Sequence, residues 1–210
     1  MELSIGAEVI PLFSSPVYCR NLGLYQQPEE LKQLRELVTA EDFPWMKNHD
    51  NEVSRDNHWL ESIKDTRLYN LITKEIESYF YGLLQADSDI KIRITESWLN
   101  RTAPGQQHHK HRHSNSIISG VYYFDVLPES GSLIFSKDAF QAIEYTTLNS
   151  NIYNSKHWIL NPKNHTLFLF PSDLEHKVSK NMSNSNRISL SFNTFISGPI
   201  SKAYLQSLEI

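Results

Sequence analysis

The sequence predicts a mainly β protein of the α+β class, in which a β-sandwich or barrel carries a supporting layer of helices. Two observations support this fold class. Apolar residues recur at helical spacing in the first 85 residues, and short alternating or apolar runs separated by turn residues follow from about residue 90. A chain of 210 residues is also long enough for one domain with a sizeable core.

The first part of the chain predicts one strand and two helices. Residues 9–19 are apolar around a Ser-Ser-Pro interruption, which indicates an opening strand with a bend. We expect Cys19, the single cysteine, to be a small buried residue there. Pro28 and the two glutamates after it begin a helix whose leucines recur at helical spacing. A second helix is predicted from about Thr66 to Gln85, with an apolar stripe of Leu68, Ile72, Ile76, Tyr79 and Leu83.

The second part predicts strands. Ile90–Ile94 alternates strictly between apolar and polar residues, as a half-buried strand does. Shorter strand-like runs follow at 117–124, 132–135, 167–170 and 188–195. We therefore expect a single domain over 1–210. It has an N-terminal strand and supporting helices at about 1–88, a β core at about 89–197, and a C-terminal tail at 198–210.

The overall composition disfavours two classes of partner. A net charge of -4 and a pI near 6.1 give no basic field, so nucleic acid is not expected to bind. No run reaches the roughly 18 apolar residues of a membrane span, and the first residues lack the features of a signal peptide. We expect a cytoplasmic protein, in the host cytoplasm if it is phage-encoded, with a homodimer as one option for its assembly.

Four of the nine histidines crowd into the segment HHKHRH at 108–113, which predicts a metal site. Alternate side chains of an extended segment share a face, so His111 and His113 form one candidate pair of ligands. His109 and His111 share the same spacing and form the competing pair. His176, which follows the apolar run LFLFP, is the third candidate. Three protein ligands would leave up to three positions of an octahedral iron open for a cosubstrate and dioxygen.

Arg187 begins the alternating run RISLSFN, eleven residues after His176. An inward arginine among apolar strands is unfavourable unless it is paired with an anion. A guanidinium grips a carboxylate through two hydrogen bonds, so a diacid cosubstrate could supply the partner. The alternative is a structural ion pair with one of the 24 acidic residues.

Four segments carry a family resemblance across most of the chain. They are IPLFSSPVYC at 10–19, ESWLNRTAPGQQHHKHRHSNSIISGVYYF at 96–124, GSLIF at 131–135, and LFLFPSDLEHKVSKNMSNSNRISLSFN at 167–193. Together they resemble the 2-oxoglutarate/Fe(II)-dependent oxygenase superfamily, and especially a branch of phages and bacteria that is grouped near the prolyl hydroxylases.

This resemblance implies a double-stranded β-helix core of the jelly-roll, cupin-like type, with helices against one face and Fe(II) at its mouth. It implies that 2-oxoglutarate chelates the iron through its 2-oxo acid end and binds Arg187, and a hydroxyl such as that of Ser189, through its distal carboxylate. Tyr123 or Tyr122, together with Asn100, would line the same cavity.

The implied activity is hydroxylation of an unidentified peptide side chain or small molecule, using dioxygen and releasing succinate and CO2. No catalytic side chain is expected beyond the metal site. The superfamily usually has Asp or Glu two residues after the first histidine, whereas this chain has His113, which leaves the site one charge unit more positive. The alternatives are a cupin-like three-histidine metalloenzyme that does not use 2-oxoglutarate, and a non-enzymatic structural or binding barrel.

Overall fold

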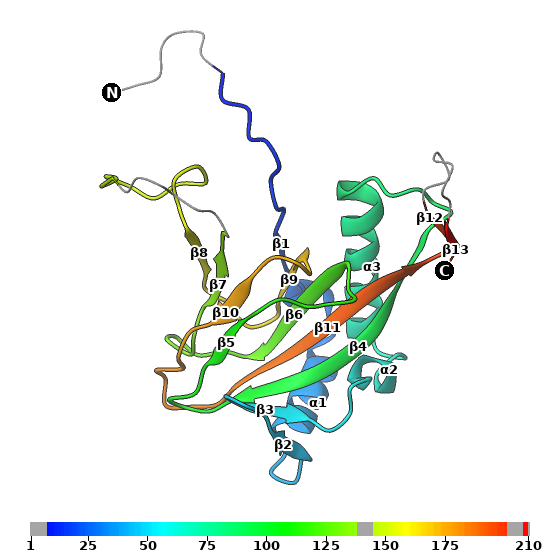
Figure 1. Cartoon of the computed structure of the whole chain (residues 1–210). Coiled ribbons are helices and arrows are strands. Elements are labelled where there is room, and N and C mark those ends of the chain that lie inside the picture. Colours follow the sequence, from blue (N-terminus) through cyan, green and yellow to red (C-terminus); the bar gives the residue numbers. More distant parts are fainter. Residues whose placement is uncertain (1–7, 138–144, 201–207, 210) are drawn as a thin grey trace.

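Two antiparallel β-sheets form the body of the protein in the computed structural model, which describes residues 8–137, 145–200 and 208–209 (Figure 1). Within these residues the larger sheet has seven strands in the order β1 (Tyr18–Asn21), β9 (Thr166–Pro171), β6 (Ile118–Asp125), β11 (Arg187–Ser197), β4 (Lys91–Thr102), β3 (Glu52–Ser54) and β2 (Trp45–Lys47). The smaller sheet has four, in the order β5 (His108–His111), β10 (His176–Val178), β7 (Leu133–Ser136) and β8 (His157–Leu160). The predicted jelly-roll class is confirmed.

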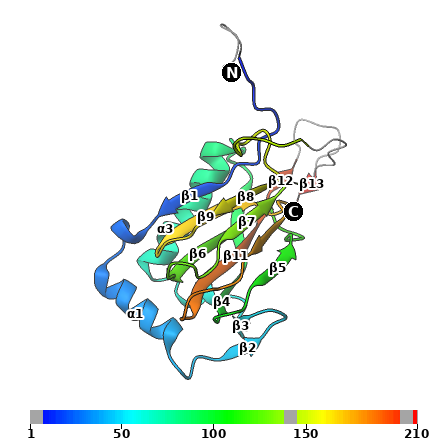
Figure 2. The ribbon, with the colours of Figure 1, turned by 90° about the vertical axis from the view of Figure 1, so that its left-hand side faces the viewer.

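The helices lie against the outer face of the larger sheet (Figures 1 and 2). They are α1 (Pro28–Thr39), the short α2 (Trp59–Ser62) and α3 (Arg67–Glu77), which continues as a π-helical turn over Ser78–Leu83; a 3-10 turn spans Gly23–Tyr25. Thr66 caps α3 by accepting a hydrogen bond from the backbone N–H of Tyr69. The Glu30 carboxylate of α1 accepts from the N–H groups of Arg67 and Leu68, which ties the two helices together.

The apolar side chains form two separate cores. The larger one joins the helices to the outer face of the large sheet and includes Leu34, Ile72, Leu99 and Phe192. The smaller one lies between the two sheets and consists of Val121, Tyr123, Leu133, Phe135, Phe168 and Phe170. The second core fixes the distance between the sheets, and therefore the position of every side chain that points into the space between them.

The N-terminal strand is shorter than expected. Residues 8–17 form no strand, and β1 begins only at Tyr18. The prediction that Cys19 is buried is wrong, since this side chain is exposed. β1 is an edge strand on which Tyr18 and Arg20 turn toward Glu75 of α3, so alternation directs Cys19 to the opposite, uncovered face. Within the second helix, Leu83 at the end of the predicted stripe is also exposed.

The central strands of the large sheet match the predicted runs closely, and β4 and β11 extend beyond them. β11 pairs with both β4 and β6. Gly120 of β6 lies opposite Phe192, and a Cβ atom built there would come within 2.1 Å of the aromatic ring, so only glycine fits.

Strands β2, β3, β5, β8 and β10 were not expected from the sequence. The predicted tail at 198–210 lies mostly outside the described residues, apart from the pairing of β12 (Pro199–Ile200) with β13 (Leu208–Glu209). No helix in the described part of the chain is long and apolar enough to cross a membrane.

Candidate metal centre

Two of the predicted ligand histidines face each other across neighbouring strands of the small sheet. β5 and β10 are antiparallel, and their register places His111 directly opposite His176. The centroids of the two rings are 4.4 Å apart. His176 is 4% exposed, because Phe135 and Phe170 pack around it.

His113 joins this pair from the segment that follows β5, beyond the end of that strand at His111. Its backbone N–H donates to the carbonyl oxygen of Ser172, which holds this segment against the end of β9. Its ring centroid lies 5.0 Å from that of His111 and 5.2 Å from that of His176. One nitrogen of each of these three rings lies within 4.8 Å of the others, and the group contains no carboxylate.

Hydrogen bonds fix the orientation of two of the three imidazoles. Nδ1 of His111 donates to the carbonyl oxygen of His109 at 2.9 Å, and Nδ1 of His176 donates to that of Leu174 at 2.9 Å. Because a carbonyl oxygen can only accept, each Nδ1 carries the proton and each Nε2 keeps its lone pair. A backbone carbonyl on the second nitrogen is the usual outer partner of a metal-binding histidine.

The site keeps its imidazoles neutral. Burial and, to a smaller degree, the neighbouring histidines lower the pKa of His113 to about 4 and that of His176 to about 3. Burial also lowers the pKa of His111. At neutral pH all three imidazoles are therefore uncharged, which is the form that a metal ion requires.

The competing pair of His109 and His111 is not brought together in the same way. The side chain of His109 is about half exposed and turns away from the cavity, with its Nδ1 2.9 Å from a carboxylate oxygen of Asp50. His108 does line the cavity, and its ring lies 4.5 Å from that of His111. It is absent from the group of three whose nitrogens converge.

Arg187 lies at the other end of the same cavity and is 2% exposed. One terminal nitrogen donates to the carbonyl oxygen of Ser130 at 3.1 Å, and the other donates to the Thr102 hydroxyl at 3.0 Å. Its Nε is buried without a hydrogen-bond partner. Within the described part of the chain, no Asp or Glu forms an ion pair with this guanidinium. Burial accordingly lowers the pKa of Arg187.

The other predicted cavity residues can now be placed. Asn100, Tyr123 and Ser189 all line the cavity that holds the histidines and Arg187. Tyr122 points to the opposite face of the sheet, where its hydroxyl meets Gln26 and His165. Alternation along β6 separates the two tyrosines, so the open choice between them resolves to Tyr123 as the cavity residue.

Sequence reasoning missed several residues that line the cavity, among them Asn51 and Trp98. Asn51 is 2% exposed and donates to the Asn100 side chain at 3.4 Å. It belongs to the polar segment 48–57, in which nothing in the sequence distinguishes it from the other asparagines. Trp98 lies on β4 with its ring 6.0 Å from that of His113. Alternation from Asn100 along the same strand could have found it.

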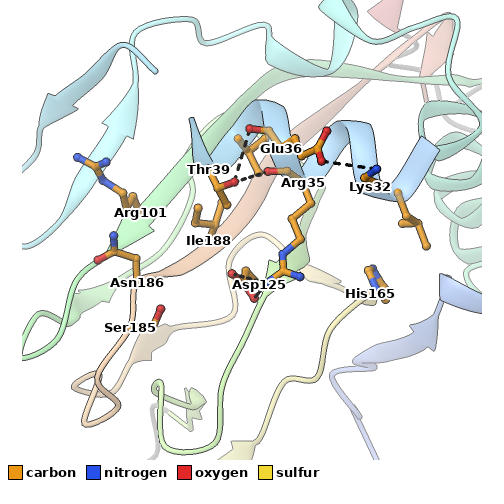
Figure 3. Close-up of a pocket in the computed structure, with 12 residues that line it drawn as sticks. Lys32, Arg35, Glu36, Thr39, Arg101, Asp125, His165, Ser185, Asn186 and Ile188 are labelled. Carbon is orange, nitrogen blue, oxygen red and sulfur yellow. Dashed lines mark hydrogen bonds and ion pairs between the residues drawn. The ribbon is translucent and has the colours of Figure 1, made fainter. Parts of the chain in front are cut away.

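A larger hollow of about 640 Å³ lies elsewhere, between α1 and the outer face of the large sheet (Figure 3). Its charged side chains are paired within the chain. Arg35 bonds to Asp125 at 3.1 Å, and Arg101 bonds to Glu52 at 2.6 Å. Because these charges are already satisfied, this hollow has no chemical feature that calls for a ligand, and the smaller histidine cavity is the better candidate site.

Part of the sequence matches a known protein family. Residues 96–193, a little under half of the chain, match the family model described as "Putative 2OG-Fe(II) oxygenase". The matched segment runs from β4 to β11, so it contains the three histidines and Arg187. A search of curated protein sequences found no match.

Solved structures share the fold. An oxidoreductase of the 2OG-Fe(II) oxygenase family from Burkholderia pseudomallei is 15% identical with a TM-score of 0.60, over 85% of this chain and 83% of that one. HygX from Streptomyces hygroscopicus, solved with nickel and 2-oxoglutarate bound, is 9% identical with a TM-score of 0.56, over 86% and 82%. The non-haem α-ketoglutarate-dependent carbocyclase SnoK from nogalamycin biosynthesis is 10% identical with a TM-score of 0.58, over 88% and 82%.

Proposed function

We propose a ligand set and a reaction for this chain on the premise that it belongs to the 2-oxoglutarate/Fe(II)-dependent oxygenase superfamily, which the sequence predicts and the family match confirms. The chain is thus an oxidoreductase whose cofactors are Fe(II) and 2-oxoglutarate. The branch near the prolyl hydroxylases, and a phage-like origin, stay predictions.

His111, His113 and His176 are the proposed iron ligands. The three rings fit a divalent metal because they converge, are neutral at physiological pH, and have two Nδ1 protons already committed to backbone carbonyls. Imidazole suits iron among the first-row metals. When bound, iron and 2-oxoglutarate together supply the oxidising power that hydroxylates a C–H bond with dioxygen, with succinate and CO2 as coproducts.

The observation that carries the proposal is the incomplete environment of Arg187 in the same cavity. Burial of an arginine without an anionic partner is unfavourable, and this side chain retains an unpartnered Nε beside its terminal nitrogens. A carboxylate that accepted from Nε and one terminal nitrogen would complete the guanidinium. The distal carboxylate of 2-oxoglutarate is the proposed partner, with its other end toward the histidines.

Three further residues are proposed to contact the cosubstrate. Ser189 lies two positions after Arg187 on β11, so both side chains point into the cavity. Tyr123 is completely buried close to Arg187, and burial raises the pKa of its hydroxyl, which therefore stays a hydrogen-bond donor. Asn100 donates to the Ser191 hydroxyl at 3.0 Å and accepts from Asn51, which fixes its amide in place.

The apolar walls of the cavity exclude water from the metal end. Phe170 and Val178 line it, and Phe135 packs behind His176. Exclusion of water strengthens the charge interactions inside and prevents side reactions of the oxidant. The remaining parts of the proposal are a hydroxylase reaction with dioxygen, a peptide side chain or small molecule as primary substrate, a cytoplasmic location and a homodimer.

Anaerobic titration of the metal-free protein with Fe(II) and then 2-oxoglutarate tests the proposal. We expect a weak visible charge-transfer band that needs both additions, because the 2-oxo acid must chelate the iron for the band to arise. His176→Ala should remove the band by removing the metal. Arg35→Met, which changes a paired arginine of the other hollow, should leave it intact. Fe(II) binding without any band on addition of 2-oxoglutarate would instead favour the cupin-like metalloenzyme.

A further inference from the structure

A second group of metal-binding side chains lies outside the cavity. His49 and Asp50 belong to the turn between β2 and β3, and His109 lies on β5 with its side chain turned away from the inner histidines. One ligand atom of each residue lies within 4.8 Å of the others. None of the three belongs to the proposed iron site, so neither group deprives the other of a ligand.

Asp50 is held in a fixed position between the two imidazoles. One carboxylate oxygen accepts from the backbone N–H of His109 at 3.0 Å and from its Nδ1 at 2.9 Å. The other accepts from Nδ1 of His49 at 3.0 Å. The backbone contact joins two segments that are 59 residues apart, which orders the carboxylate before any ion arrives. Pre-ordering of the ligands reduces the entropy lost when an ion binds.

The exposure of the three side chains differs in a way that suits an ion entering from solvent. Asp50 is 19% exposed, whereas His109 is 52% and His49 is 79% exposed. The two rings lie 5.6 Å apart and face the same carboxylate. With neutral imidazoles the group carries one negative charge, whereas the inner group carries none, so it attracts a cation. An ion that binds would replace the Nδ1 protons that now point at the carboxylate.

We propose that His49, Asp50 and His109 form a second metal site, on the surface, for a divalent transition metal such as Zn(II) or Cu(II). Two imidazoles and one carboxylate are donors that Zn(II), Ni(II) and Cu(II) bind well, and water would complete the coordination. Ca(II) and Mg(II), which prefer oxygen ligands throughout, should not bind there.

Zn(II) titration of the metal-free, tag-free protein, with calorimetry and metal analysis after desalting, tests the site. We expect two Zn(II) equivalents for the unchanged chain. His49→Ala and Asp50→Ala should each lose one equivalent, while His157→Ala, which changes an exposed histidine of β8, should keep both. Circular dichroism checks that each variant is folded.

The double variant separates this site from the proposed iron site. His176→Ala should lose the inner equivalent and keep the outer one, and combining it with His49→Ala should remove both. A single equivalent in the unchanged chain that His49→Ala leaves in place would overturn the surface site without touching the inner one. Two equivalents that persist in both His49→Ala and Asp50→Ala would also overturn it.

Discussion

The two faces of the seven-stranded sheet differ in whether a buried charged side chain has a partner of opposite charge. On the helix face, Glu75 is 1% exposed and is bonded to Arg20 at 2.7 Å and to the Tyr18 hydroxyl at 2.5 Å. On the cavity face, Arg187 is 2% exposed and has only neutral partners among the described residues. A buried charge that the chain itself completes stabilises the fold, whereas one that the chain leaves incomplete is positioned for a ligand.

The largest effect should come from the metal end of the cavity face. We expect His176→Ala to weaken Fe(II) binding by on the order of 100-fold or more, because even loss of an outer partner of a ligand reduces affinity by about 10–100-fold. His111→Ala and His113→Ala should behave alike, and His109→Ala should have far less effect. Equilibrium dialysis under anaerobic conditions measures the affinities, with His157→Ala as the control. Equal losses for His109→Ala and His113→Ala would contradict the ligand set.

The next largest effect should come from Arg187, the buried charge that has no ion-pair partner among the described residues. Arg187→Met should weaken 2-oxoglutarate binding by about 2–5 kcal/mol, the usual loss when one partner of a buried charge pair is removed. Metal affinity should not change, and neither should the stability of the metal-free protein fall, since no ion pair within the chain is lost. Calorimetry with Mn(II) in place of iron gives the affinity. Unchanged 2-oxoglutarate affinity would show that the carboxylate binds elsewhere.

The helix face predicts the reverse pattern for Glu75→Gln. We expect a loss of about 1–3 kcal/mol in the free energy of unfolding, since two strong hydrogen bonds to a buried carboxylate are weakened. Binding of metal and 2-oxoglutarate should not change. Urea denaturation measures the loss, and Glu77→Gln, on the exposed side of the same helix, should stay within about 0.5 kcal/mol of the unchanged chain. Weaker 2-oxoglutarate binding in Glu75→Gln would erase the distinction between the faces.

A smaller effect should follow pH. In the metal-free protein burial holds the pKa of His113 at about 4 and that of His176 at about 3, below the 6.5 of a solvated histidine. The unfolded chain therefore binds more protons below pH 6.5, and the free energy of unfolding should fall as pH drops from 6.5 toward 4. Urea titrations at several pH values measure this slope. In His176→Ala the free energy of unfolding should fall less steeply with decreasing pH, by an amount that corresponds to at most one bound proton. An identical slope would mean that the histidine is protonated in the folded state.

The smallest change in binding is expected for His113→Asp, which restores the carboxylate that the superfamily usually supplies. We expect the variant to retain both Fe(II) and 2-oxoglutarate, since the added negative charge attracts the metal, whereas His113→Ala loses the metal. The same anaerobic titration compares them. Equal loss in both variants would mean that the segment holding His113 fits an imidazole alone.

Much of the fold followed from local patterns, and the exceptions have physical causes. The helices at 28–39 and 67–77, and the strands β4, β6, β9 and β11, have strong periodicity or long apolar runs. The short strands β5 and β10 lack such a pattern. A segment such as HHKH joins a sheet through backbone hydrogen bonds, which its side chains do not indicate. Cys19 was predicted to be buried because its neighbours in the sequence are apolar. It is exposed because its face of the edge strand β1 is uncovered.

The candidate site was predictable where a residue type is rare and chemically specific. The three histidines and Arg187 stand out in the sequence, and the structure gathers them around one cavity. Asn51 could not be found, because its role depends on the β2–β3 turn folding back against Asn100. The partnership of Asp50 with His109 has the same origin, since it joins residues that are distant in the sequence.

The proposed ligands are divided between the sheets: His111 and His176 belong to the small sheet, and Arg187 belongs to the large one. A 2-oxoglutarate molecule bound to the metal at one end and to Arg187 at the other would therefore link the two sheets, in addition to the apolar residues between them. Binding of iron and 2-oxoglutarate would then reduce local opening of the four strands of the small sheet. Amide protons of β5, β7 and β10 should exchange more slowly in the loaded enzyme than in the empty one, whereas those of α1 and α3 should hardly respond.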